Sequence, residues 1–205
     1  SQAGINTSYR TLLAEARDYA ASLDAKDNRP FGLTGPTSLQ LIVQILALAK
    51  ISRPFIYLDD NWSKLKVQEL IDDLLVGRVL GPASERDTAG VLGPSDNGGG
   101  PRMELSSSIF CFTNTGGSSG SSKLVARGSR ATLDNIRNYG ETFSLGTGKR
   151  VALTSTPAYG PFVSQVLGAL LHGGCLHPYD LRKGAGESFA NWIAQERVTH
   201  LHLIP

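Results

Sequence analysis

The stretch "FTNTGGSSGSSKLV", residues 112–125, joins the end of an apolar run to glycines, serines and a lysine. Two kinds of structure fit such a stretch. In a linker, glycine and serine keep the backbone flexible and solvated. In a phosphate-binding loop, the same small residues let backbone N–H groups surround an anion. Composition favours the two about equally, so the flanking residues and the spacing have to distinguish them.

The flanks favour a built loop. An apolar run, residues 109–112, precedes the glycines closely, and Lys123 follows them before the chain turns apolar again. Glycines leave backbone amides unshielded, hydroxyl groups add donors, and the lysine supplies positive charge. Two serines stand between the last glycine and the lysine, which excludes a Walker A loop. The residues expected to contact phosphate are Thr115, Gly116, Gly117, Ser118, Ser119, Gly120 and Lys123.

Outward from this stretch, helical and strand patterns alternate along the chain. Apolar residues at helical spacing predict helices at residues 8–23, 37–51, 62–75, 130–143, 162–173 and 187–197. Short apolar runs predict strands at residues 30–34, 53–59, 77–81, 106–113, 150–155, 175–180 and 200–204. This alternation predicts an α/β fold, with a mostly parallel sheet that carries helices on both faces.

The fold class also predicts where a ligand binds. In parallel sheets, ligands gather at the carboxyl ends of strands, where loops enter the following helix. The glycine-serine stretch is expected at such a junction, where it would form a phosphate loop at residues 113–125. Residues 82–102 are rich in Gly, Pro, Ser and Asp and are expected to form a surface excursion within the domain.

Composition excludes several classes of function. The 205 residues carry 20 Lys and Arg against 18 Asp and Glu, without a basic stripe, so we expect no nucleic-acid partner. No apolar run approaches the roughly 20 residues of a membrane span, so no membrane association is expected. Cys111 and Cys175 lie in apolar stretches and are expected to be buried free thiols, which fits a cytoplasmic location.

Other polar residues are interpreted structurally. The four histidines, at positions 172, 177, 200 and 202, have no Asp, Glu or Cys at ligand spacing, so no metal site is predicted. The pairs Asp59 with Asp60 and Asp72 with Asp73 are expected at solvated turns or helix ends, because neighbouring helical positions do not face each other. Trp192 is expected in the core or at its rim.

The spacing around the lysine resembles the phosphate loop of the adenylate-forming enzymes, which include acyl-CoA synthetases, luciferases and adenylation domains of nonribosomal peptide synthetases. Their pattern reads [YF]-T-S-G-[ST]-T-G-x-P-K-G-V. Aligned on Lys123, six positions agree and one hydroxyl replaces another. Three positions depart: Gly116 replaces serine, Ser122 replaces proline and Leu124 replaces glycine. Losing the proline and a glycine changes the stiffness of the loop and its exit.

Further segments resemble the same family in the same order. They are "TSYRTLLAEARDYAASL" from residue 7, "ILALAKISRPFIYLDD" from residue 45 and "GKRVALTSTPAYGPFVSQVLGALLHGGCLHPYD" from residue 148. The resemblance spans nearly all of the chain. It implies that residues 1–205 are the first part of a large N-terminal domain, with the family's catalytic residues expected beyond Pro205.

The resemblance implies a ligase that uses ATP and Mg²⁺. The parent enzyme would convert a small carboxylic acid to an acyl-adenylate with loss of pyrophosphate, then pass the acyl group to the thiol of CoA or of a carrier protein. Tyr159 and Gly160 would line the acid pocket. Peptide-synthetase domains that activate α-amino acids carry an aspartate at the position of Gly160. Since a buried ammonium needs a partner, a fatty, aryl or keto acid fits better. The alternatives are a shifted alignment and a relocated carboxylate.

Two other hypotheses remain. The chain can belong to a degenerate, non-catalytic module that binds a nucleotide or a partner, which the three loop departures favour. An unrelated flavodoxin-like or Rossmann-like binder is the other, and the ordered run of matching segments argues against it.

Overall fold

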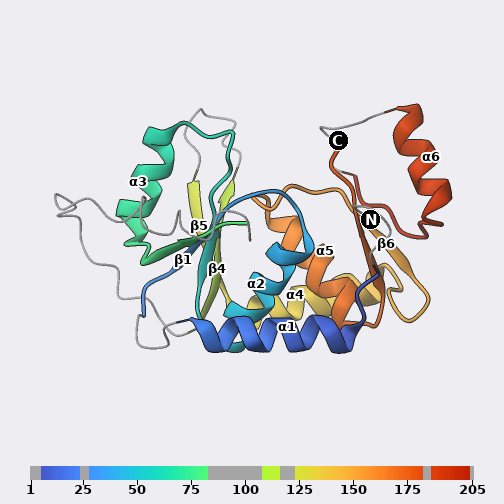
Figure 1. Ribbon diagram of the computed structural model, residues 1–205, viewed down its shortest axis with the longest axis horizontal. Helices are drawn as coiled ribbons and strands as arrows, with labels where there is room; N and C mark the ends of the chain where they lie inside the picture. Colours follow the sequence, from blue (N-terminus) through green and yellow to red (C-terminus); the bar gives the residue numbers. More distant parts are fainter. Residues whose placement is uncertain (1–5, 24–27, 83–107, 116–122, 182–185, 204–205) are drawn as a thin grey trace. The chain divides into compact units, whose positions relative to one another are not determined.

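The computed structural model describes residues 6–23, 28–82, 108–115, 123–181 and 186–203 (Figure 1). The chain divides into two compact units, one from Thr7 to Ser129 and one made mainly of Arg130–Pro205. Each unit has its own sheet with helices packed around it. The predicted α/β class with mostly parallel strands is confirmed, and the strands divide over two sheets.

The larger unit contains a five-stranded sheet with the order β3-β1-β2-β4-β5. Its strands are β1 (Phe31–Leu33), β2 (Phe55–Tyr57), β3 (Arg78–Leu80), β4 (Ile109–Thr115) and β5 (Lys123–Gly128). The first four strands pair in parallel, and β5 pairs with β4 in antiparallel. Strand β5 was not predicted from the sequence, because none of its six residues is buried and they show no apolar alternation.

Three helices belong to this unit: α1 (Tyr9–Ser22) packs against α2 (Leu39–Lys50), and α2 and α3 (Lys64–Leu74) cover the sheet. Each begins after a serine, because Ser8, Ser38 and Ser63 accept a hydrogen bond from a backbone N–H of the first turn. Figure 1 shows α2 and α3 on opposite faces of the sheet. Both faces of the sheet are therefore covered, as predicted.

The core of the larger unit is almost entirely apolar. One cluster joins α3 to the sheet and contains Ile56, Leu58, Ile71, Leu74, Val76, Val79 and Phe112. Among the described residues of this unit, Gln44 on α2 is the one buried polar side chain. Its Nε2 donates to the Gly81 carbonyl at 2.9 Å and to the Tyr19 hydroxyl at 3.2 Å. This side chain links α2 to α1 and to the end of β3.

The smaller unit contains two parallel strands, β6 (Arg150–Leu153) and β7 (Cys175–Pro178). Its helices are α4 (Ser129–Thr142), α5 (Gly160–Leu171) and α6 (Glu187–Gln195). The strand predicted at residues 200–204 is wrong at residues 201–203, and residue 204 lies outside the described residues. His200 forms one isolated parallel bridge with Val151. The Thr154 hydroxyl donates to the His202 carbonyl, so a side-chain bond takes the place of the next ladder bond.

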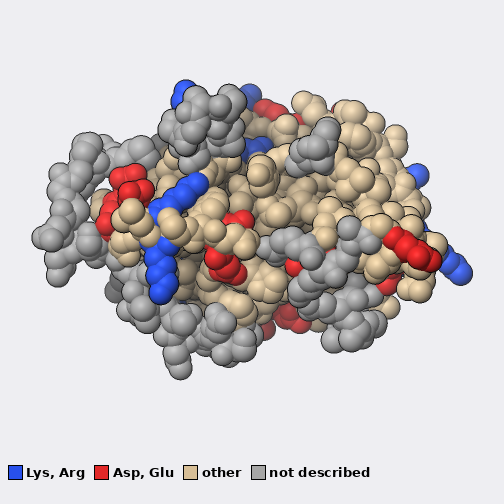
Figure 2. Space-filling view, turned by 90° about the horizontal axis from the view of Figure 1, so that it is seen from above, with Lys and Arg blue, Asp and Glu red and all other residues tan. Residues whose placement is uncertain are grey.

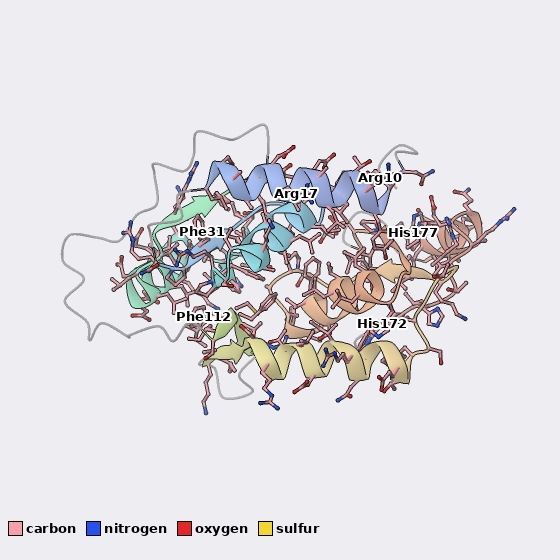
Figure 3. The ribbon with its side chains drawn as sticks, turned by 90° about the horizontal axis from the view of Figure 1, so that it is seen from below. Arg10, Arg17, Phe31, Phe112, His172 and His177 are labelled. Atoms are coloured by element: carbon pink, nitrogen blue, oxygen red, sulfur yellow. The ribbon has the colours of Figure 1, made fainter. Side chains whose placement is uncertain are left out.

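Helices α4 and α5 approach closely through two glycines. A Cβ atom on Gly140 of α4 would lie 2.0 Å from the ring of His172, and one on Gly168 of α5 would lie 2.8 Å from Tyr139. His172 also hydrogen-bonds through Nδ1 to the Gly168 carbonyl at 2.8 Å. Figure 3 shows His172 between the two helices. Each helix thus receives a ring from its neighbour where it has no side chain.

The two thiols differ. Both cysteines are free, but Cys111 is fully buried and Cys175 is exposed. Burial raises the pKa of the Cys111 thiol to about 12. The expectation of a buried thiol is wrong for Cys175, because it begins β7, a strand in which only His177 is buried. Within the described ranges, no helix is both long and apolar enough to cross a membrane.

Candidate functional site

The glycine-serine stretch connects two paired strands. Thr113 of β4 pairs with Val125, Asn114 with Leu124 and Thr115 with Lys123, in antiparallel register. Residues 116–122 lie outside the described residues, so Gly116, Gly117, Ser118, Ser119 and Gly120 have no structural account here. Their flanks correct the expectation that the stretch enters a helix: the chain returns along the sheet as β5 and forms a β-hairpin.

The hairpin extends at the carboxyl edge of the parallel strands. The pairing of β2 with β4 ends at Ile56 with Phe112, and β4 continues for three residues to Thr115. Strands β1 and β2 end at this same edge, at Leu33 and Tyr57. The two ends of segment 116–122 therefore lie where parallel α/β sheets bind their ligands.

Polar groups in the loops after β1 and β2 form hydrogen bonds with one another at this edge. Thr34 donates from Oγ1 to a carboxylate oxygen of Asp60 at 2.6 Å. Asp59 accepts from the backbone N–H of Asn61 at 2.9 Å and from its side-chain amide at 2.8 Å. The Tyr57 hydroxyl donates to the Gly35 carbonyl. Asp59 and Asp60 thus stabilise turns, as the sequence predicts.

Tyr159 and Gly160 lie at the turn from β6 into α5. Gly160 is the first residue of α5, and Tyr159 precedes it as an N-cap residue whose ring is half exposed. The backbone N–H of Tyr159 donates to the Thr156 carbonyl at 3.1 Å, which closes the turn. The two residues therefore lie next to each other at the N-terminus of α5. The backbone N–H groups of a helix's first turn are available to bind a ligand.

Two hydroxyl groups in the same turn are buried without a partner. The Oγ of Ser155 and the Oγ1 of Thr156 have no hydrogen-bond partner among the described residues. A buried polar group in this state needs an explanation, such as a water, a ligand or another segment of protein. Neither residue was predicted from the sequence as part of a site. A sequence feature that could have indicated them is the run of hydroxyl residues Thr154, Ser155 and Thr156 directly after the apolar strand.

A third unpartnered group lies farther along α5. Gln165 is fully buried, and neither its amide nitrogen nor its amide oxygen has a partner in the described part of the chain. Its neighbour Ser164 is satisfied, since its hydroxyl donates to the Asn135 amide oxygen of α4 at 2.6 Å. The helix that begins at Gly160 therefore carries an unsatisfied amide one turn beyond its N-terminus.

His177 is buried and contacts two partly exposed side chains, Glu196 and Arg150. Its Nδ1 lies 3.0 Å from a carboxylate oxygen of Glu196, and Arg150 contacts the same oxygen at 3.3 Å. Arg150 also donates from Nε to the Glu196 carbonyl. Burial lowers the pKa of His177, Arg150 lowers it further, and Glu196 offsets part of the shift. The network connects β6 and β7 to the end of α6.

The histidines have structural partners rather than a metal arrangement. Across the described ranges, no three or more His, Cys, Asp or Glu side chains are close enough to hold a metal ion. His200 contacts the Thr199 hydroxyl at 2.8 Å, and His202 contacts the Tyr139 hydroxyl at 3.2 Å and stacks on its ring.

Comparison with known families decides the relationship. The sequence pattern described as "AMP-binding enzyme" matches residues 2–205. This chain belongs to the AMP-binding enzyme family. The resemblance of the chain to adenylate-forming enzymes is thereby confirmed. No curated protein sequence matches the chain.

Solved structures of similar fold agree with the family. CmiS6 superposes with a TM-score of 0.80 at 20% identity, over 98% of this chain and 52% of its own. O-succinylbenzoate coenzyme A synthetase from Bacillus subtilis, in complex with AMP, gives 0.78 at 11% identity, over 97% and 55%. The Vibrio cholerae adenylation domain AlmE, in complex with glycyl-adenosine-5'-phosphate, gives 0.75 at 15% identity, over 95% and 44%. This AMP-binding family chain spans about half the length of these proteins.

The predicted site residues of this family member fall into two groups. Thr115 and Lys123 lie directly opposite each other at the base of the hairpin, in the larger unit. Tyr159 and Gly160 are adjacent at the start of α5, in the smaller unit. The first group thus lies at the end of a strand, and the second at the start of the helix that follows β6.

Proposed function

We propose that this chain is the N-terminal part of an enzyme that activates a carboxylic acid with ATP, forming an acyl-adenylate and releasing pyrophosphate. Membership of the AMP-binding enzyme family supports the reaction class. The single structural observation that carries it is the β4–β5 hairpin at the carboxyl edge of the parallel sheet. The acid's carboxylate oxygen attacks the α-phosphorus of ATP and displaces pyrophosphate. A thiol of CoA or of a carrier protein then attacks the acyl carbon and forms a thioester, with AMP as the leaving group.

The hairpin suits phosphate binding better than a linker would. The pairing of Thr115 with Lys123 fixes the two ends of segment 116–122 close together. Preorganised backbone N–H groups and a nearby cation stabilise phosphate charge without rearrangement during the reaction. Lys123 is exposed at the base of the hairpin and would contact the leaving phosphates. Mg²⁺ is expected to accompany the nucleotide, as it does in most phosphoryl-transfer sites.

Binding of ATP to the chain tests the loop assignment. Lys123→Ala removes one charge-assisted contact, and Gly117→Val blocks backbone approach, so each is expected to weaken ATP binding about tenfold or more. Isothermal titration with MgATP measures the change. Lys64→Ala, another exposed lysine in the same unit, is the matched control and should bind as the unchanged chain does. Equal affinity of all four proteins would refute the assignment.

The reaction itself is tested on the parent protein. Carboxylate-dependent exchange of labelled pyrophosphate into ATP is measured with a panel of amino, aryl, keto and fatty acids. Exchange that depends on one acid establishes acyl-adenylate formation and identifies the substrate. A folded protein that binds ATP but exchanges with no acid would exclude the ligase activity.

We also propose that Tyr159 and Gly160 line the pocket for the acid. Gly160 has no carboxylate for a substrate ammonium, which favours acids without an α-amino group. The unpartnered hydroxyls of Ser155 and Thr156 offer hydrogen bonds to a ligand at the same turn. Gly160→Asp in the parent protein is expected to shift acid-dependent exchange toward α-amino acids. Gly146→Asp, in a loop of the same unit where the backbone φ is not positive, is the control. An unchanged acid preference would contradict this assignment.

A second candidate is a non-catalytic module that binds a nucleotide or a partner. The replacements at Gly116, Ser122 and Leu124 favour it, because they alter the family's loop pattern. The two candidates differ in one result: the module binds ATP in titration without supporting pyrophosphate exchange in the parent protein.

A further inference from the structure

The smaller unit contains a hollow that the proposed reaction does not use. It has a volume of about 550 Å³ and lies between the residue after β7 and the exposed side of α6. Six residues line it: Tyr179, Glu187, Ser188, Asn191, Trp192 and Gln195. Five of the six are on α6, which has no buried residue along its length. The hollow is therefore an open surface feature rather than part of a core.

One wall of the hollow is polar and acidic. Glu187, Asn191 and Gln195 follow one another at intervals of four residues, so they lie along one face of α6. They present a carboxylate and two amide groups, which together offer several acceptor oxygens. None of the six lining residues is a lysine or arginine. Figure 2 shows both acidic and basic side chains in the region where Figure 1 places α6.

The other wall is aromatic. The ring centroids of Tyr179 and Trp192 are 4.6 Å apart, and Phe189 packs on both rings from behind, at 4.9 Å from Tyr179 and 5.8 Å from Trp192. Three rings in mutual contact hold one another in place. Such a wall offers flat, fixed faces to a ligand and loses little conformational entropy on binding.

Both ends of the hollow are held to β6. The backbone N–H of Tyr179 donates to the Leu153 carbonyl of β6 at 3.0 Å. At the far end of α6, Arg150 of β6 holds Glu196 through its carbonyl and its carboxylate. Glu196 and Arg150 are thereby engaged with each other. Glu187 is the charged group among the residues that line the hollow.

We propose that this hollow binds a guanidinium group, either of free arginine or of an arginine side chain in a polypeptide. A guanidinium is planar, stacks on aromatic faces and donates up to five hydrogen bonds to carboxylate and amide oxygens. An ammonium group is compact and strongly hydrated, so it gains less from two aromatic faces. A nucleotide is disfavoured because its phosphates would approach the Glu187 carboxylate.

Fluorescence of Trp192 tests the proposal on the full chain. The protein has two tryptophans, so the Trp62→Phe variant leaves Trp192 as the reporter. It is titrated with free L-arginine and with N-acetyl-arginine methylamide. The citrulline counterparts have nearly the same shape without the charge. We expect a saturable change with the arginine ligands and at least about tenfold weaker binding of the citrulline ligands, since charge-assisted hydrogen bonds are the stronger ones.

The two arginine ligands distinguish the source. Binding of the capped ligand at least as tight as that of free arginine identifies an arginine within a polypeptide. Tighter binding of free arginine identifies the amino acid itself.

A matched pair of variants assigns the response to the hollow. Glu187→Gln is expected to weaken binding of arginine ligands about tenfold or more, whereas Glu69→Gln, on α3 of the larger unit, should leave it unchanged. Both glutamates are exposed, so neither change should disturb folding, which circular dichroism checks. A non-saturable response, equal binding of citrulline, or equal effects of the two variants would overturn the proposal. None of these outcomes affects the proposed acid activation.

Discussion

The two units of this chain differ in what they bury. Six polar side chains are buried among the described residues, and five of them belong to the unit Arg130–Pro205: Thr132, Ser155, Ser164, Gln165 and His177. The larger unit buries one, Gln44, and that amide makes two hydrogen bonds. Several of the five have atoms without any partner. A polar group with partners serves the fold, whereas one without partners is a candidate for binding.

Packing of α4 against α5 should be the feature most sensitive to substitution. Gly140→Ala places a Cβ atom 2.0 Å from the His172 ring, which can move away only by losing its bond to the Gly168 carbonyl. We expect the free energy of unfolding to fall by about 1–3 kcal/mol, as overpacked cores show. Urea denaturation followed by circular dichroism measures it.

Two further variants control for this change. Gly128→Ala, whose Cβ would meet no atom closer than 3.7 Å, should be far milder. The double variant Gly140→Ala/His172→Ala should lose less stability than the two single changes add up to, because the clash is gone. Strict additivity would show that the ring contact does not limit position 140.

The two buried glutamines should respond in opposite ways. Gln44→Met removes two hydrogen bonds and leaves the Gly81 carbonyl unpaired, at a cost of roughly 1–3 kcal/mol. Gln165→Met removes an amide that has no partner in the described residues, so the chain should keep or gain stability. Thermal and urea denaturation of the two variants compare them directly. If Gln165→Met costs as much as Gln44→Met, the amide of Gln165 serves the fold.

The smallest expected effect is on the pH dependence of stability. Burial and Arg150 lower the pKa of His177 below its usual value of 6.5, so the folded chain binds this proton less readily than the unfolded chain. Stability from this group is complete above about pH 6.5 and is lost as the pH falls from there toward the lowered pKa. Melting temperatures between pH 7.5 and about 5 are expected to decline on the acid side.

A variant at this position isolates the contribution. His177→Gln should show a smaller acid decline, while His200→Gln, on the same sheet, should keep the decline of the unchanged chain. Parallel pH profiles for both variants would show that burial of His177 contributes nothing to the pH dependence.

Sequence patterns predicted the helices and strands whose own residues determine where they begin and how they are buried. Ser8, Ser38 and Ser63 precede amphipathic runs, and each caps the predicted helix. Strands β1 and β2 are short, apolar and fully buried, and their runs are clear in the sequence. In these places the residues that form the element also determine its burial.

The predictions failed where a neighbouring segment of the chain, rather than the element's own residues, determines the structure. Strand β5 is largely exposed, so its pairing with β4 leaves no apolar alternation to detect. Exposure of Cys175 depends on the edge position of β7, and residues 201–203 lose the ladder to a bond from Thr154. For the candidate site, the hydroxyl run was visible in the sequence, but only burial without a partner marks Ser155 and Thr156.

The contact between Gly140 and His172 also has an evolutionary consequence. Every substitution at position 140 adds at least a Cβ atom into the space of the ring, so the glycine is free to change only after position 172 has become small. The order of mutations is thereby restricted along any lineage of this chain. Among its close homologues, the two positions are expected to covary, with a bulky residue at 172 inherited together with glycine at 140.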